Sequence, residues 1–218
     1  MADINVKSAQ HYMNLWEEDI KLLNAKDWSV AYDGVTGAVN QDPRNPEFLI
    51  LLGNLQEWKI YLVQDNEEKN YHLSNALQNY REAAALRPAW PFTWNHITLV
   101  KYRLGEIDDE FLMAMENAME TGPWEPGVQQ VTVEVGLRTW KMLDFGLREK
   151  IVRNIYRGIS LQPDQMMKIL EKYNQLHLVC LEKNLKPAVL AYCGQAARNL
   201  NNMNHSARLK MSEQLSKP

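Results

Sequence analysis

The sequence predicts an all-α fold made of helical hairpins, and two observations support that prediction. Helix-forming residues dominate, and no stretch shows the alternation of polar and β-branched apolar residues that is typical of a strand. A pattern with offsets of +4, +3 and +5 also recurs four times, each time closing on a proline. Its copies are Ala31, Val35, Ala38 and Pro43; Ala76, Tyr80, Ala83 and Pro88; Phe111, Met115, Ala118 and Pro123; and Ile151, Ile155, Gly158 and Pro163.

Each copy of this pattern predicts the end of a helix. Its first three residues share one helix face, because they stand at i, i+4 and i+7. The proline stops the helix, since it has no N–H to donate and disfavours the α conformation of the residue before it. Successive prolines lie 45, 35 and 40 residues apart, near the period of about 34 residues of tetratricopeptide (TPR) repeats. We therefore predict a TPR-like, right-handed solenoid of about four degenerate hairpins.

The hairpins follow one another along the chain. The first is expected to turn at residues 26–28 before its second helix. In the second, Gly53 matches the glycine of the W-x2-L-G signature of a first TPR helix, and residues 61–72 are expected to form an inserted surface loop. In the third, the first helix contains Trp94 and turns at Gly105. The fourth ends at the last proline of the pattern.

Beyond residue 163 the pattern changes. We predict a helix over 165–183, a break at 184–187 and a further helix, a hairpin that would cap the open end of the solenoid. The predicted organisation is a repeat region over 1–163, a capping hairpin over 164–200 and a polar, frayed tail over 201–218.

Composition narrows the class of protein. The 218 residues include 45% hydrophobic and 23% charged residues, with a net charge of −3, which is ordinary for a soluble globular chain. Nothing indicates the clustered basic surface that nucleic acid requires, so we predict no nucleic-acid partner. No apolar run approaches the roughly 18 residues of a membrane span. Contact with a membrane is expected only through an anchor upstream of Met1 or a membrane partner.

No motif indicates catalysis. The five histidines lack a second metal ligand at the right spacing, and nucleotide-binding and hydrolase motifs are absent. We predict no metal, no cofactor and no enzymatic activity. His96 is expected to pack or form hydrogen bonds, with ligand contact as the alternative. Asp108, Asp109 and Glu110 precede a helix, where acidic side chains cap free N–H groups, and Glu125 is interpreted in the same way.

Three sequence blocks resemble the VpsP-type proteins of bacterial exopolysaccharide clusters. They are Y-x3-W-E-E at 12–18, RPAWP-x2-W at 87–94 and GPWEP at 122–126, inside a best-matching stretch from about Tyr12 to Trp140. The resemblance implies a helical-repeat accessory protein in polysaccharide biosynthesis or export, with no established reaction. Members usually begin with a membrane-anchoring helix that this sequence lacks. The implied location is the periplasmic face of the bacterial inner membrane if an upstream anchor has been removed, and the cytoplasm otherwise.

A stacked-repeat solenoid lines its concave surface with residues of its first helices. The aromatic and amide side chains and the one arginine expected there suit a bound protein segment or, alternatively, sugar rings that stack on tryptophan. A further alternative is that the same side chains pack in the core. The predicted partner-binding groove comprises Met13, Trp16, Ile20, Ile50, Asn54, Glu57, Phe92, Asn95, Leu99, Tyr102 and Arg103.

We therefore predict a non-catalytic scaffold or adaptor that holds a protein partner of an exopolysaccharide assembly or export machine. A cytoplasmic co-chaperone or regulatory adaptor is the alternative. Chaperone-binding repeats use several lysines and arginines to hold a C-terminal carboxylate, whereas Arg103 is the only cation predicted in this groove. A glycan-binding or sugar-active protein is a third possibility, in which Glu57 is the only carboxylate that can be placed in the groove, whereas glycoside hydrolysis uses a pair.

The two cysteines suggest a cross-link. Cys180 lies six residues before Lys186, and Cys193 lies seven after it, so an antiparallel hairpin would bring the thiols to similar height. They could form a disulfide in an oxidising compartment. The alternative is that both are buried as small apolar residues.

Overall fold

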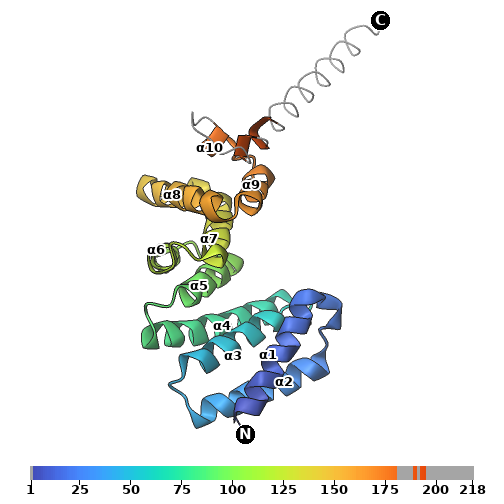
Figure 1. The fold of residues 1–218 in the computed structure, drawn as a ribbon. Coiled ribbons are helices and arrows are strands. Elements are labelled where there is room, and N and C mark those ends of the chain that lie inside the picture. The colour runs from blue at the N-terminus through green and yellow to red at the C-terminus, as the bar shows by residue number, and fades with distance from the viewer. Residues whose placement is uncertain (1, 181–188, 191, 195–218) are drawn as a thin grey trace, which may run out of the picture. The chain divides into compact units, whose positions relative to one another are not determined.

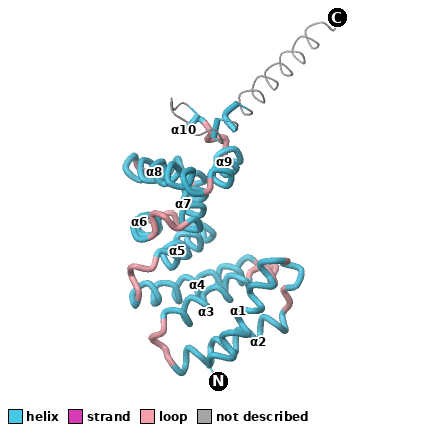
Figure 2. Tube along the Cα trace, in the orientation of Figure 1, coloured by secondary structure: helices cyan, strands magenta, loops and turns pink. Residues whose placement is uncertain are grey.

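A computed structural model describes residues 2–180, 189–190 and 192–194 of the chain (Figure 1). Within these ranges every regular element is a helix and none is a strand (Figure 2), which confirms the all-α prediction. The contacts divide the chain into two compact units, Met1–Pro123 (unit 1) and Trp124–Pro218 (unit 2). The division falls at the third proline of the pattern.

Unit 1 is a series of helical hairpins in which successive helices pack together, α1 on α2, α3 on α4 and α5 on α6. Its elements are α1 (Ala2–Glu18), the 3-10 helix η1 (Ile20–Leu22), α2 (Ala25–Gln41), α3 (Pro46–Lys59), α4 (Asn66–Leu86), α5 (Pro91–Leu104) and α6 (Asp109–Thr121). Unit 2 has α8 packed on α7 and α9 packed on both. Its described elements are α7 (Pro126–Arg138), the 3-10 helix η2 (Trp140–Met142), α8 (Phe145–Leu161), α9 (Pro163–Lys172) and α10 (His177–Cys180).

The proline pattern ends helices as predicted. Helices α2, α4, α6 and α8 each end two residues before the proline that closes their copy. In each case the residue just after the helix donates its backbone N–H to the carbonyl of the third residue of the pattern. Asp42 donates in this way to Ala38, and Arg87 donates to Ala83. Every apolar or small residue of the four copies is buried. The pattern therefore marks both the buried face and the last turn of each second helix.

A second proline starts several of the following helices. This proline lies three residues after the one that closes a copy of the pattern, and it occupies the first turn of the next helix. The three examples are Pro46, Pro91 and Pro126. Proline fits there because the first turn leaves its N–H groups without a helical partner. The two prolines thus fix a short turn between successive helices.

Two predicted turns prove to be helical. Residues 26–28 belong to α2, which begins at Ala25 because the side chain of Asn24 accepts the N–H of Asp27 at 3.0 Å. Most of the predicted insertion over 61–72 belongs to α4, where Asp65 caps the N–H of Glu68 at 2.8 Å. The acidic run that suggested a solvated loop is a helix start, since a cap followed by acidic residues stabilises the N-terminal turn.

Asp108 caps α6 as predicted, and Asp109 and Glu110 lie in its first turn, where acidic side chains stabilise the helix dipole. Asp108 accepts the N–H of Phe111 at 3.0 Å at the start of α6. Glu110 also pairs with Arg81 and with Lys101, whose side chain is 2% exposed. Glu125 stands at the N-cap position of α7 without a side-chain capping bond, so its predicted capping role is wrong.

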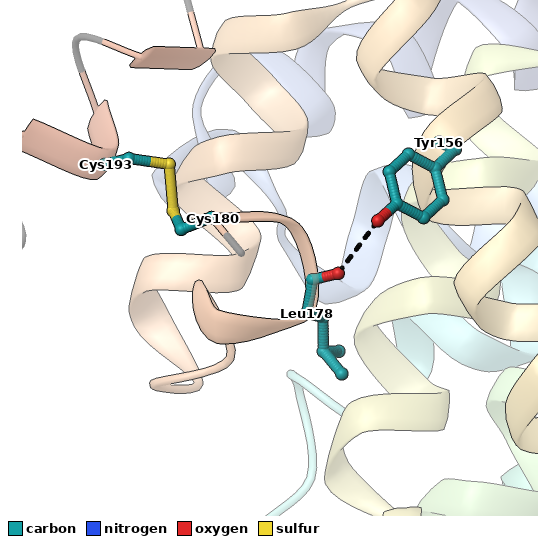
Figure 3. The surroundings of a disulfide bond; sticks show 4 residues. All are labelled: Tyr156, Leu178, Cys180 and Cys193. Atoms are coloured by element: carbon teal, nitrogen blue, oxygen red, sulfur yellow. Dashed lines mark hydrogen bonds between the residues drawn. A yellow bond between two sulfur atoms is a disulfide. The ribbon is translucent and has the colours of Figure 1, made fainter. Parts of the chain in front are cut away.

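The chain beyond α9 departs from the predicted long helix over 165–183. Helix α9 ends at Lys172, and Asn174 has a φ of 55°, in the left-handed region. Cys180 and Cys193 are joined by a disulfide with 5.6 Å between their Cα atoms (Figure 3). The hydroxyl of Tyr156 on α8 donates to the carbonyl of Leu178 at 3.0 Å, which ties the segment before Cys180 to α8. The predicted capping hairpin over 164–200 lies partly, and the predicted tail wholly, outside the described residues.

Candidate functional site

A groove of about 490 Å³ lies across α1, α3 and α5, the first helices of three successive hairpins in unit 1. Each helix contributes residues three or four positions apart, which share one face. The lining is Gln10, Met13, Asn14 and Glu17 from α1; Leu51, Asn54, Glu57 and Trp58 from α3, with Tyr61 just beyond it; and His96, Leu99 and Arg103 from α5.

A buried carboxylate organises the floor of this groove. The side chain of Glu57 is 11% exposed and accepts a hydrogen bond of 2.6 Å from the hydroxyl of Tyr80 on α4. Nδ1 of His96 lies 3.3 Å from the same oxygen, and Arg103 forms an ion pair with the other. Burial alone would raise the pKa of Glu57, but the hydrogen bond and charge of His96, the charge of Arg103 and the Tyr80 hydrogen bond together lower it. Glu57 is therefore ionised at neutral pH.

The Tyr80 hydroxyl also reaches Asn54. Its oxygen lies 2.7 Å from Oδ1 of Asn54 and 2.6 Å from Oε1 of Glu57. Burial, together with the charge of Glu57, raises the pKa of Tyr80 well above its ordinary value, so the phenol keeps its proton and donates it to these acceptors. Asn54 therefore takes part in the network of Glu57.

Gly53 makes the approach of Tyr80 possible. A Cβ atom at this position would lie 2.4 Å from Cε1 of the Tyr80 ring, closer than real Cβ contacts come. The residue is the glycine of the W-x2-L-G signature, and its role here is close packing of α3 on α4. Without that packing, the Tyr80 hydroxyl would not reach Glu57 from the neighbouring helix.

Five predicted groove residues line the groove together. They are Met13, Asn54, Glu57, Leu99 and Arg103. Whether they contact a partner stays a prediction. His96 stacks on Tyr80 with ring centroids 4.7 Å apart, as the packing prediction expects, and it also lines the groove. Its contact with a ligand stays a prediction.

The other predicted residues lie elsewhere. Trp16 is 2% exposed and Asn95 is 8% exposed, so the assignment of both to the groove surface is wrong. Ile20 lies in η1 and is exposed, and Ile50 packs against the cluster around Leu73 and Ala76. Phe92 contacts Trp90 with ring centroids 5.4 Å apart, and Tyr102 is half-buried. None of the six lines the groove.

The error on α1 is one of helical phase. Its buried stripe is Ala9, Met13 and Trp16, and its groove stripe is Gln10, Asn14 and Glu17, one residue later. Both run at i, i+4 and i+7, so spacing alone does not separate them. The polarity of the side chains separates the two stripes, since a large indole belongs on the buried face and amides belong on the solvent-exposed face. That signal could have identified Gln10, Asn14 and Glu17 on α1. Leu51, Trp58 and Tyr61, which also line the groove, are outside its reach because they belong to α3 and the segment after it.

Two other properties bear on the site. Within the described residues no helix is long and apolar enough to cross a membrane. No group of three or more histidine, cysteine, aspartate or glutamate side chains in that part of the chain is arranged to hold a metal ion.

Comparison with known proteins shows the fold. No family model and no curated protein matches the chain. Among solved structures, a thermophilic TPR protein from Thermus thermophilus is similar, with a TM-score of 0.54 and 13% identity over 82% of this chain and 100% of that one. The protein MamA is similar with a TM-score of 0.50 and 14% identity over 83% and 92% of the two chains. These likenesses confirm a TPR-like helical-repeat fold.

Proposed function

We propose that this chain is a non-catalytic scaffold or adaptor that binds a segment of a protein partner in the groove of α1, α3 and α5. One observation carries the proposal: three successive first helices turn one face each toward a single groove, the arrangement by which helical repeats build extended binding surfaces. We place its partner in bacterial exopolysaccharide biosynthesis or export, and the resemblance of three sequence blocks to VpsP-type proteins supports that setting.

The chemistry of the groove suits an extended peptide. Gln10, Asn14 and Asn54 offer amides, which match the donors and acceptors of a peptide backbone. Trp58 and Tyr61 add aromatic surface, and Tyr61 is 50% exposed. Aromatic anchors of this kind supply much of the free energy of protein interfaces. The buried Glu57 network holds α3, α4 and α5 together beneath them, so the surface is preorganised.

The same network disfavours the two alternatives. A co-chaperone would use cations to hold a C-terminal carboxylate, but Arg103 is already ion-paired with Glu57. A sugar-active enzyme would need a carboxylate acting as acid, base or nucleophile. Glu17 and Glu57 both line the groove, which corrects the prediction that Glu57 is the only carboxylate there. Glu57 is held by Tyr80, His96 and Arg103, and these contacts give it a structural role.

The groove proposal predicts which variants lose the partner. Tagged protein is used to capture partners from solubilised membranes of the native host, identified by mass spectrometry, and the affinity of the captured protein is then measured with purified components. The double variant Asn14→Ala, Tyr61→Ala removes groove contacts from exposed positions and should weaken binding about tenfold or more, the loss of one anchor residue. Tyr71→Ala is the matched control, since Tyr71 on α4 is 64% exposed and lies outside the groove. Equal affinity of both variants for the partner would overturn the proposal.

We further propose that the protein works in an oxidising compartment, at the periplasmic face of the inner membrane. The disulfide supports this location, because such bonds persist where thiols are not kept reduced. It closes a loop of about 14 residues, worth about 3 kcal/mol in the chain-entropy model. Protein isolated from the host and unfolded without reductant should resist alkylation at Cys180 and Cys193, and react at both after reduction. Full alkylation before reduction would contradict the location.

A further inference from the structure

Helix α8 in unit 2 carries a second stripe of residues that the groove does not explain. Its inner stripe, which is buried, is Leu147, Ile151, Asn154, Ile155 and Gly158. Its outer stripe is Phe145, Arg148, Glu149, Val152 and Arg153, at i, i+3, i+4, i+7 and i+8. Together with Trp140, this outer stripe lines a hollow of about 500 Å³. We call Trp140, Lys141, Met142 and the outer stripe of α8 the η2–α8 surface.

Large apolar side chains project from this surface. Phe145 is 75% exposed and Met142 is 66% exposed, the two highest values among the large hydrophobic residues that the structure describes. Exposed apolar groups gathered at one place, with polar groups around them, mark a surface that is covered by something else. Trp140 is half-buried beside them.

Positive charge surrounds these apolar side chains. The η2–α8 surface contains three basic residues, Lys141, Arg148 and Arg153, against one acidic residue, Glu149, although the chain as a whole has a net charge of −3. Arg148 is held in place, since its Nε donates to the carbonyl of Trp140 at 3.0 Å and its guanidinium lies 5.6 Å from the indole centroid. The side chain of Arg153 is 57% exposed and forms an ion pair at 4.0 Å with Glu149, which is itself exposed. Asp144 is occupied as the cap of Leu147.

We propose that the η2–α8 surface docks on a lipid bilayer rich in anionic headgroups. Apolar side chains that project outward enter the boundary between headgroups and acyl chains, while lysine and arginine around them bind the phosphates. A tryptophan at the same level is typical of that boundary. An acidic peptide would meet the same charges, but the central anchors of a protein interface sit in sheltered pockets. Phe145 borders the hollow but is 75% exposed, and Met142 is 66% exposed. Both side chains thus face solvent, which favours the bilayer. This proposal does not depend on the groove.

The test is cosedimentation of the full chain with vesicles. Vesicles of phosphatidylglycerol mixed with phosphatidylcholine are compared with vesicles of phosphatidylcholine alone. We expect binding to the anionic vesicles that falls with added salt. The variant Met142→Ser, Phe145→Ser should lower the partition coefficient about tenfold or more, and Arg153→Gln should lower it about fivefold, the effect of one charge at such a surface. All three positions are exposed, so the fold should survive, which circular dichroism checks.

The matched control is Tyr71→Ser, which removes an aromatic ring of similar exposure from unit 1 and should leave vesicle binding unchanged. Absence of binding to anionic vesicles overturns the proposal. So does equal binding by the double serine variant, or equal loss in Tyr71→Ser. Binding of an acidic amphipathic peptide without binding of vesicles would assign the surface to a protein partner instead.

Discussion

Replacing Trp16 by alanine is expected to destabilise unit 1 by about 3–5 kcal/mol, the usual cost of deleting a buried indole. The side chain is 2% exposed and belongs to the core cluster that includes Met13, Trp28 and Leu55. It also meets the ring of Trp58 edge-on, with centroids 5.7 Å apart. Urea unfolding followed by circular dichroism measures the loss. Because a domain of this size is stable by only about 5–15 kcal/mol, much of the protein would be close to unfolding.

Trp124→Ala is the control for this substitution. It makes the same chemical change in unit 2, at a side chain that is 60% exposed, and should alter stability by only about 0.5 kcal/mol or less. Equal effects of the two substitutions would show that Trp16 is not a core residue. A loss of partner binding in Trp16→Ala would say nothing about the groove, since the helix that carries Gln10, Asn14 and Glu17 would itself be disordered.

Gly53→Ala should destabilise unit 1 by a comparable amount, although it adds a single methyl group. The new Cβ would meet the rigid Tyr80 ring at 2.4 Å, and overpacking of this kind costs about 1–3 kcal/mol. Moving the ring would also break the hydrogen bond from Tyr80 to the buried Glu57, and bonds to charged groups contribute about 1.5–3 kcal/mol. We expect a total loss of about 3–5 kcal/mol, measured by the same urea unfolding.

Gly37→Ala tests whether the effect comes from contact or from the loss of glycine. Gly37 lies inside α2, and a Cβ there would meet nothing within 4 Å. Alanine is the better helix former by about 1 kcal/mol, so Gly37→Ala should be neutral or stabilising. If Gly53→Ala were equally well tolerated, α3 and α4 could not be as close as the structure places them.

The ends of the second helices could be predicted from the sequence because local chemistry decides them. A proline lacks the N–H that a helix needs, wherever the rest of the chain lies, and the residues at i, i+4 and i+7 before it must share a face. Ala76, Tyr80 and Ala83 illustrate this, since all three are 0% exposed. The start of α4 is also decided locally, by the side chain of Asp65, which caps the helix. The acidic residues that follow Asp65 suggest a solvated loop, but they form the first turn of α4.

The groove was harder to predict because packing decides which face of a first helix is buried. On α1 the inner and outer stripes differ by one residue and have the same spacing, so only their polarity separates them; Trp16 belongs to one core cluster with residues of α2 and α3. On α5 the groove uses His96 rather than Asn95, because His96 stacks on Tyr80 of α4. The sequences of α1 and α5 do not reveal which helices pack against them. Glu57 lines the groove, and the three donors that hold it come from α4 and α5.

The helix pairs of unit 1 join neighbours along the chain, or helices one apart, as for α1 with α3. Such a topology needs no distant segment before its early contacts form. During synthesis, the first hairpin meets its packing partners as soon as α3 leaves the ribosome, and each later hairpin adds to a finished neighbour. Trp16 and Trp28 would then be sheltered from aggregation while the groove is still being built.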